Sequence, residues 1–558
     1  MKKNTAIVMS LILSTITSIS AVASDGHKTT GQAQWFERAR KTMALKPYRL
    51  FKNNQRLKNG FKLLDNNGHF TDLNKKEKQL LKKEKIRSKW FSDQRNINTV
   101  LQKVFYRLWR MAEKYRGKEI PKDKYDRLRK SLIYYGQLEM QRADGPGRFH
   151  TSCFAIPLSA VNIYFSRLAD MDAVESGKDK DQLHIKFNKT LSDLAMQSWT
   201  QPKGGKEIDK NVISPERFRH SVYWVGGNGF HYRPVFECAL LLKSGAMMEV
   251  LGTSARDSLS LTSQTTNQES FWSEGLTSDG AGWGHGRQCM VWMYPYDGIY
   301  SSLRILNSLD KSPWDKKLQN GIDCVISYIR GSSWFIYKGY VPPCLSRHNF
   351  SYMSNESRQP RTAGLAEMIL NNFDKSLDKK QREELQRFVK EAESKSIKMK
   401  TSAPGIYHGN RYFWNNDTLV RKNEEAYAII RMASSKVNGI ESFKSFNYFT
   451  CDGQTMFCRD GNEYTSIIGS WELDSVPGVT ALRGLKLKAM TNWRGFNSKF
   501  AYSAGIVDGN DAACGFITDK VNRCNECTMK FPPELFAVTA HKSWFIFGDT
   551  LLALGAGL

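Results

Sequence analysis

The hydrophobic pattern divides the chain into two parts. Up to about residue 400, apolar positions recur with helical spacing and charged side chains occupy the opposite helix face. Between residues 100 and 114 the apolar positions are Val100, Leu101, Val104, Phe105, Leu108 and Met111, and the basic positions are Lys103, Arg107, Arg110 and Lys114. This pattern predicts a long series of amphipathic helices whose basic faces are solvated.

Beyond residue 404 the apolar runs become short and β-rich, with Asp-Gly, Asn-Gly and Pro-Gly turn signals between them. Strand-like runs begin at Thr418, Ala426, Thr465 and Trp544. We therefore predict an α + β multidomain chain. It has a helical domain over residues 24–375, a charged helix and linker over 376–403, and an antiparallel sheet domain over 404–558.

The N-terminus has the pattern of a secretory signal. Lys2 and Lys3 precede an apolar stretch, and Ala21-Val22-Ala23 offers the small residues that signal peptidase needs. We predict that residues 1–23 are a signal peptide removed near Ala23, so the protein would be secreted or periplasmic. An uncleaved membrane anchor fits less well because the stretch is short and interrupted by Ser and Thr. No later segment is apolar enough to predict a membrane span.

Composition and charge narrow the partners. The 558 residues are 41% hydrophobic, which excludes general disorder, and 82 Lys and Arg against 55 Asp and Glu give a formal net charge of +27. Such a charge favours an acidic polymer as the partner. Export makes nucleic acid an unlikely substrate, and the 12% aromatic content suits sugar stacking. We therefore predict an acidic polysaccharide partner and no nucleic acid.

The ten cysteines predict neither a metal site nor a cofactor. Cys451 with Cys458 and Cys524 with Cys527 are the closest pairs, and only the second has metal-like spacing. Disulfides and unpaired core thiols both remain open, because pairing cannot be read from sequence.

The densest candidate site is the glycine-rich segment that runs from Phe271 to Gln288. Glycines at 280, 282, 284 and 286 prevent a regular helix and allow close approach of a ligand, so His285 is predicted on a shaped loop between helices. Tyr294 and Tyr296 follow within a dozen residues. A second loop, from Trp224 to Arg233, presents Asn228 and His231 before an apolar helix; a helix cap is an equally good interpretation of Asn228.

The order of these motifs resembles polysaccharide lyase family eight. The shared order is Gly-Gly-Asn before an Ala-Leu-Leu helix, Asp-Gly-x-x-Trp-x-His with Tyr soon after, Leu-Ser-Arg, Ser-Ser-x5-Glu-Ser and Arg-Asp-Gly-Asn-Glu-Tyr, spread over roughly residues 130–558. The resemblance implies an incomplete (α/α) toroid followed by an antiparallel β-sandwich. It also implies β-elimination next to a uronic acid in substrates such as chondroitin sulfate, hyaluronate or xanthan.

The resemblance assigns roles residue by residue. Donors must first neutralise the uronate carboxylate, and a base and an acid then move the protons. A tyrosine serving both steps needs cationic neighbours because its ordinary pKa is about 10. The implied catalytic residues are Asn228, His285, Tyr294, Arg347 and Glu441, with His231 and Tyr296 as alternatives for the Asn and Tyr positions. Pro343 stands where some members carry a second arginine.

Aromatic and basic residues near His285 are candidates for binding substrate. These are Trp283, Arg287 and Trp292, with Trp272 as a further stacking candidate, although any of the tryptophans could belong to the core.

The sequence therefore predicts a carbon–oxygen lyase acting on acidic polysaccharide. One alternative is a glycoside hydrolase that uses Glu274 and Asp279 as its two carboxylates. Another is a secreted protein that binds acidic glycans without cleaving them. The stretch from Lys542 resembles strands from the middle of the family's β-domain, so the ending at Leu558 predicts a shortened member or a fragment.

Overall fold

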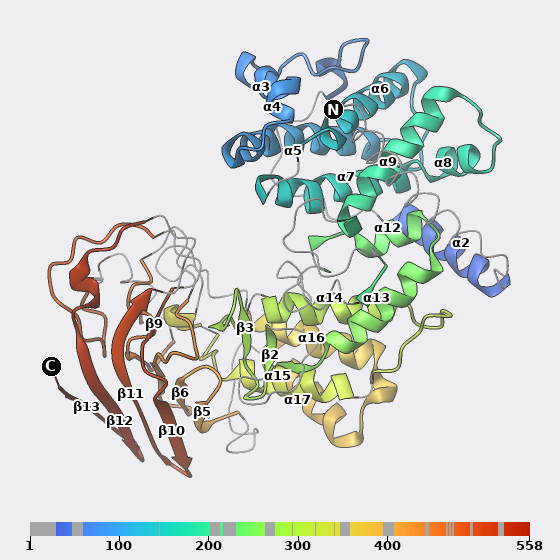
Figure 1. Ribbon diagram of the computed structural model, residues 1–558. Helices are drawn as coiled ribbons and strands as arrows, with labels where there is room; N and C mark the ends of the chain where they lie inside the picture. Colours follow the sequence, from blue (N-terminus) through green and yellow to red (C-terminus); the bar gives the residue numbers. More distant parts are fainter. Residues whose placement is uncertain are drawn as a thin grey trace. The chain divides into compact units, whose positions relative to one another are not determined.

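The computed structural model combines an N-terminal helical region with C-terminal antiparallel sheets (Figure 1). It describes residues 30–46, 60–143, 146–200, 213–215, 230, 232–262, 274–292, 294–318, 320–339, 341–345, 358–393, 407–440, 446–461, 463–464, 467, 470, 472, 474–490, 495–522 and 529–557. None of the helices in these ranges combines the length and apolar composition that a membrane crossing needs.

The described helices come almost entirely before residue 394. They are α2 (Thr30–Leu45), α3 (Lys75–Leu80), α4 (Lys83–Ile86), α5 (Phe91–Glu113), α6 (Lys122–Met140), α7 (Ile156–Ser166), α8 (Leu168–Glu175), α9 (Gln182–Thr200), α12 (Val235–Leu241), α13 (Gly245–Ser258), α14 (Tyr294–Ser308), α15 (Asn320–Ser333), α16 (Arg358–Asn372) and α17 (Lys379–Glu393). The last of these lies inside the range predicted to hold a charged helix and linker.

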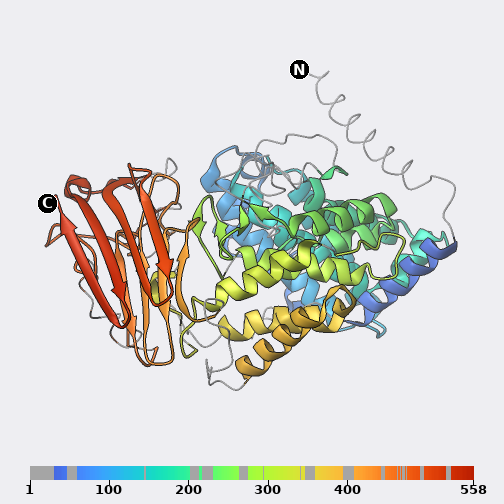
Figure 2. The ribbon, with the colours of Figure 1, turned by 90° about the horizontal axis from the view of Figure 1, so that it is seen from below.

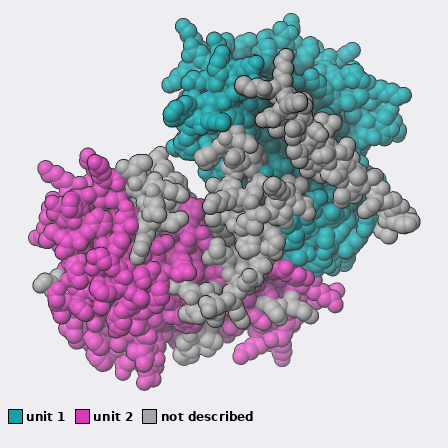
Figure 3. All heavy atoms as spheres, in the orientation of Figure 1, with its two compact units in different colours: residues 1–223, 230–254, 308–316 teal, residues 224–229, 255–307, 317–558 magenta. Residues whose placement is uncertain are grey.

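The chain forms two compact units (Figure 3). Residues 1–223, 230–254 and 308–316 make up unit 1, and residues 224–229, 255–307 and 317–558 make up unit 2. The core of unit 1 surrounds α5, whose predicted apolar face is buried as expected. Arg107 differs from the prediction: it is buried and makes two hydrogen bonds to Asp72, at 2.7 and 2.8 Å. The hydrogen-bonded carboxylate of Asp72 compensates the charge of the Arg107 guanidinium and so permits its burial.

A small sheet interrupts the helices of unit 2. Its strands, in spatial order, are β1 (Leu261–Thr262), β2 (Gly275–Thr277), β3 (Gly282–Gly284) and β4 (Gln288–Cys289). The segment around His285 was predicted as a loop between helices; it is instead a β-hairpin, β3–β4. Strands of two or three residues with alternating glycine carry too weak a pattern to be recognised by hydrophobic periodicity.

The C-terminal part of unit 2 contains two packed antiparallel sheets (Figure 2). The first holds β5 (Gly409–Phe413), β6 (Thr418–Lys422), β7 (Tyr427–Arg431) and β8 (Gln454–Cys458), and the second holds β9 (Phe496–Ser498), β10 (Ser503–Asp508), β11 (Asp511–Asn522), β12 (Thr539–Phe547) and β13 (Thr550–Ala556). Leu419 and Ile430 of the first sheet pack in one core with Phe516, Trp544 and Ile546 of the second. The predicted antiparallel sheets are therefore present. The run expected at Thr465 shows no strand in its described residues, and Ile467 lies in an exposed turn.

The eight described cysteines are free thiols. Cys451 and Cys458 are both buried and unpaired, whereas Cys524 and Cys527 lie outside the described residues. Cys451 Sγ accepts a hydrogen bond of 3.2 Å from the fully buried guanidinium of Arg431. Burial raises the pKa of the Cys451 thiol, so it serves as a neutral core group. Of the two alternatives left by the sequence, core thiols hold for this pair.

Gly331 marks a point where helix α15 touches the small sheet directly. A Cβ at Gly331 would lie 2.0 Å from the carbonyl oxygen of Gly280, in the turn between β2 and β3. We expect Gly331→Ala to destabilise unit 2 by at least ~2 kcal/mol, because neither backbone can yield without moving an element.

Gly364 in α16 is a matched control, since a Cβ there meets nothing within 4 Å. Gly364→Ala should stabilise the protein by up to ~1 kcal/mol through helix propensity. Chemical denaturation of the two variants checks this, and equal effects at the two positions would contradict the close contact.

Candidate active site

His285 lies at the turn of the β3–β4 hairpin in a left-handed backbone conformation. Its φ is +52° and that of Gly286 is +90°. Such a φ is uncommon for a residue with a Cβ and occurs where surrounding contacts hold the backbone. The turn therefore fixes the direction in which the imidazole leaves the hairpin.

Tyr294, the first residue of α14, meets His285. The Tyr294 hydroxyl and His285 Nε2 are 2.7 Å apart, and the two ring centroids are 4.6 Å apart. Gly284 permits this approach, since a Cβ there would lie 2.4 Å from Tyr294 Cδ2. Tyr296 instead stacks on Tyr300, with the centroids 6.2 Å apart. The structure thus brings the preferred tyrosine, and not its alternative, against the histidine.

The side chains of Glu274 and Gln288 form hydrogen bonds to the backbone of the turn that carries His285. Glu274 Oε1 accepts a hydrogen bond of 2.6 Å from the Gly286 amide, and Gln288 Nε2 donates one of 2.8 Å to the carbonyl oxygen of His285. Both side chains are buried. A carboxylate that accepts a backbone N–H in such a place makes a strong, short bond. Glu274 is therefore a positioning residue for His285.

Asp279 connects the small sheet to the β5–β6 turn. Its fully buried carboxylate accepts hydrogen bonds from the backbone N–H of Asn415 at 2.9 Å and from the side-chain Nδ2 of Asn416 at 3.0 Å. Thr277 Oγ1 donates a further bond of 2.6 Å to the same carboxylate. The Asp279 carbonyl oxygen accepts from Arg411 at 2.6 Å. Asp279 thus joins segments more than 130 positions apart in the chain.

A second connection runs through the segment before Glu441. The Asn438 amide donates a hydrogen bond of 2.9 Å to the carbonyl oxygen of Arg287, and Gln288 forms a parallel bridge with Asn438. The sheet domain therefore contacts both sides of the hairpin that carries His285. These contacts between the hairpin and the sheet domain were not predicted from the sequence because the partners are distant in the chain. The polar run Asn415-Asn416-Asp417, which is typical of a turn, was a usable signal.

Burial revises two of the predicted substrate contacts. Trp283 is 2% exposed and donates a hydrogen bond of 3.1 Å to the carbonyl oxygen of Asn415, and Trp292 is 3% exposed. Both are core residues, so their predicted stacking on sugar rings is corrected. Arg287 is exposed beside His285 and stays a candidate.

Several predicted site residues lie outside the described residues. They are Asn228, His231, Trp272, Arg347 and Glu441. Their proposed roles stay predictions. Among the described residues, no group of three or more His, Cys, Asp or Glu side chains is arranged to hold a metal ion.

Comparison with known families now adds to the geometry. Residues 408–558 match the family model described as polysaccharide lyase family 8, super-sandwich domain. The match covers the C-terminal sheet domain of the chain. The resemblance deduced from the motifs is confirmed. The matched region includes Arg411, Asn415, Asn416 and Asn438, the residues that hold the His285 hairpin.

Individual relatives extend the likeness. Chondroitinase-AC of Pedobacter heparinus is 29% identical over 156 residues, which cover 27% of this chain and 20% of that protein. A solved chondroitinase AC lyase, studied with oligosaccharides, superposes with a TM-score of 0.61 at 18% identity and covers 94% of this chain and 67% of the other.

Two further solved structures share the fold. The chondroitin AC lyase of Streptomyces coelicolor A3, in complex with chondroitin sulphate, has a TM-score of 0.59 at 13% identity and covers 94% of this chain and 69% of the other. Paenibacillus xanthan lyase has a TM-score of 0.54 at 14% identity and covers 94% and 48%. The helical region and the antiparallel sheets thus have the arrangement of elements found in lyase structures of this family.

The Glu274 bond to Gly286 can be tested without any substrate. We expect Glu274→Ala to lower the free energy of unfolding by about 1 kcal/mol, because it leaves the half-buried Gly286 N–H without its acceptor. Glu274→Gln keeps an acceptor oxygen and should cost clearly less. Denaturation of the two variants measures the difference, and equal losses would show that the hydrogen bond to Gly286 is not what Glu274 contributes.

Asp417, in the β5–β6 turn, gives the stability a defined pH dependence. Burial raises the pKa of Asp417 from 3.8 to about 6, although Ser434 donates a hydrogen bond of 2.5 Å to it. The folded state thus holds the proton more tightly than the unfolded state, so stability is full below pH 3.8 and falls as the pH rises to about 6.

Asp417→Asn removes this loss. The stability of Asp417→Asn relative to the parent should increase by about 2 kcal/mol between pH 4 and pH 7, since one pKa unit corresponds to about 1.4 kcal/mol and part of the loss has already occurred at pH 4. Asparagine also tolerates the left-handed backbone at this position, where φ is +46°. Thermal unfolding across this range checks the expectation, and a difference that does not change with pH would contradict it.

Proposed function

We propose that the protein is a secreted polysaccharide lyase that cleaves uronic-acid-containing acidic polysaccharide by β-elimination. The observation that carries the proposal is the contact of 2.7 Å between the Tyr294 hydroxyl and His285 Nε2, on a hairpin held by the family 8 sandwich domain. The Pedobacter and Streptomyces relatives named as chondroitin lyases support a glycosaminoglycan as the substrate.

In this proposal the tyrosine moves the protons. Tyr294 takes the C5 proton of the uronic acid, the bond from C4 to the glycosidic oxygen breaks, and a C4–C5 double bond forms. The departing oxygen then receives its proton from the same hydroxyl. His285 Nε2 lies 2.7 Å from the Tyr294 hydroxyl and would act by donating a hydrogen bond to the phenolate, which is rare near neutral pH because the ordinary pKa of tyrosine is about 10.

The uronate carboxylate must be neutralised for this step. Asn228 and Arg347 are the proposed donors, with His231 as the alternative to Asn228, and Glu441 is proposed to orient Tyr294 or Arg347. No metal or cofactor is assigned a part. These roles come from the motif resemblance and are tested by substitution.

The hydrolase alternative has less support. Glycoside hydrolysis needs two carboxylates that flank the cleaved bond. Asp279 is fully buried and accepts bonds from the β5–β6 turn, and Glu274 is bonded to the Gly286 amide. Both candidates therefore have structural partners. The experiment must therefore distinguish a lyase from a protein that binds acidic glycan without cleaving it.

The test measures ultraviolet absorbance during incubation with chondroitin sulfates, hyaluronate, heparin, alginate and xanthan. We expect a rise on at least one glycosaminoglycan, reporting the unsaturated uronic product. Tyr294→Phe should lower the rate by at least ~10²-fold, the usual contribution of a general acid or base. Tyr296→Phe is the matched control and should keep most activity.

Other outcomes decide between the alternatives. New reducing ends without absorbance would support a hydrolase, and retention of glycan without either product would support a binding protein. Activity that survives Tyr294→Phe but not Tyr296→Phe would transfer the role to Tyr296.

A further inference from the structure

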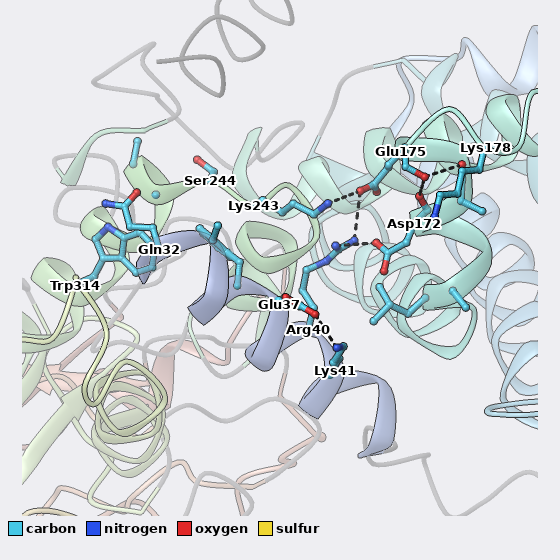
Figure 4. Close-up of a pocket in the computed structure, with 18 residues that line it drawn as sticks. Gln32, Glu37, Arg40, Lys41, Asp172, Glu175, Lys178, Lys243, Ser244 and Trp314 are labelled. Carbon is cyan, nitrogen blue, oxygen red and sulfur yellow. Dashed lines mark hydrogen bonds and ion pairs between the residues drawn. The ribbon is translucent and has the colours of Figure 1, made fainter. Parts of the chain in front are cut away.

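Unit 1 contains a cavity whose lining includes neither His285 nor Tyr294. It has a volume of about 860 Å³ and lies between α2, α8 and the turn from α12 to α13 (Figure 4). This volume is in the range of sites that hold small molecules. We call it the α2–α8 cavity. Its lining residues all belong to unit 1.

One wall of the cavity is a network of paired charges. The Arg40 side chain is 5% exposed and forms an ion pair of 2.8 Å with Asp172. Glu175 accepts from Lys243 at 2.8 Å and from Arg40 at 3.4 Å (Figure 4). Burial alone would raise the pKa of Glu175, but the bonds from Lys243 and Tyr164 lower it below its ordinary value. This wall therefore offers fixed donors beside fixed acceptors.

Lys243 occupies the position just after a helix C-terminus at which glycine is the usual residue. It follows the end of α12 with φ at +52°, and the Ser244 amide bonds to the carbonyl oxygen of Ala239. This left-handed position at a helix end normally favours glycine because it has no Cβ. A lysine here is unfavourable for the backbone but brings its ammonium to Glu175 on the cavity wall.

The other end of the cavity is apolar. Phe36 and Trp314 pack with ring centroids 5.1 Å apart and line the floor. Gly245 is also part of the lining, and a Cβ there would come within 3.1 Å of Trp314. Both rings are core residues, 7% and 5% exposed, so they close this end of the cavity, and recognition of a ligand rests on the hydrogen-bonding wall.

The charges of the cavity differ from those of the whole chain. Four cations, Arg40, Lys41, Lys178 and Lys243, line it with three carboxylates, Glu37, Asp172 and Glu175, which leaves a formal charge of +1 against +27 for the chain. Each carboxylate also forms an ion pair with one of these cations. A polyanion would have to compete with these pairs, whereas uncharged hydroxyls can bond to donors and acceptors without separating them.

We propose that the α2–α8 cavity of unit 1 is a binding site for a neutral sugar residue. The sugar ring occupies the space between α2 and α8, and its hydroxyls bond to the side chains of Glu175 and Lys243, which are 28% and 38% exposed. The proposal goes beyond the lyase function and does not depend on it.

The test uses the full chain and simple sugars. Methyl β-galactoside and N-acetylgalactosamine are the neutral probes, glucuronate is the anionic one, and saturation-transfer NMR with titration reports binding. Ala33 is an exposed lining residue of α2, and Gln34 is its exposed neighbour outside the lining. We expect the neutral probes to bind the parent and Gln34→Trp, and to bind at least tenfold more weakly to Ala33→Trp, whose indole fills the cavity.

A second blocking variant guards against local misfolding. Ala169→Trp introduces the same bulk from α8, on the opposite side, and should weaken binding likewise. Tyr294→Phe should leave binding unchanged. The proposal is overturned if no neutral probe binds, if both blocking variants bind as the parent does, or if glucuronate binds more tightly than the neutral sugars. Binding is measured without turnover, so a failed lyase assay leaves this result intact.

Discussion

The buried carboxylate of Asp279 is the interaction on which the candidate active site depends. The β-hairpin that carries His285 is made of strands of two and three residues, too short to be stable alone. Asp279 accepts bonds from Asn415 and Asn416 and thereby fixes the preceding turn to the sandwich domain. The Asn438 amide, which donates to the carbonyl oxygen of Arg287, holds the other side of the same hairpin. The sandwich thus acts on the geometry of the site as well as on its own stability.

The contact between His285 and Tyr294 depends on several neighbouring residues. Gly284 leaves the space for the tyrosine ring, Glu274 holds the next amide, and α14 begins at Tyr294. Each of these side chains is held in one orientation by the residues packed around it. Such preorganisation places a proton acceptor and a proton donor before any substrate arrives.

The sequence allowed the helical and sheet regions to be predicted because their patterns are long and local. The buried face of α5 and the strands β6, β7 and β12 follow directly from apolar spacing. Tyr294 was also preferred to Tyr296 from its distance to His285 in the chain. The hairpin itself was missed, since its glycines and short strands carry no period.

Residues with long-range partners could not be assigned from sequence. Trp283 was expected to stack on sugar, but its indole N–H reaches Asn415, 132 positions away. Arg107 was expected in solvent, but Asp72 draws it into the core. In both cases the partner decides the environment, and a single sequence does not reveal partners. The α2–α8 cavity has the same origin, because its wall joins residues from three separate helical segments.

The core thiols carry a further consequence for a chain that is proposed to be exported. All eight cysteines in the described ranges are reduced, and burial raises the pKa of Cys289 and of Cys344 to about 12. Such thiols are poor nucleophiles and are shielded from oxidants once the chain is folded. The described core therefore holds together through apolar packing and buried hydrogen bonds, with no disulfide among its described cysteines. The buried thiols of Cys289 and Cys344 are therefore more accessible to oxidants before folding than after it.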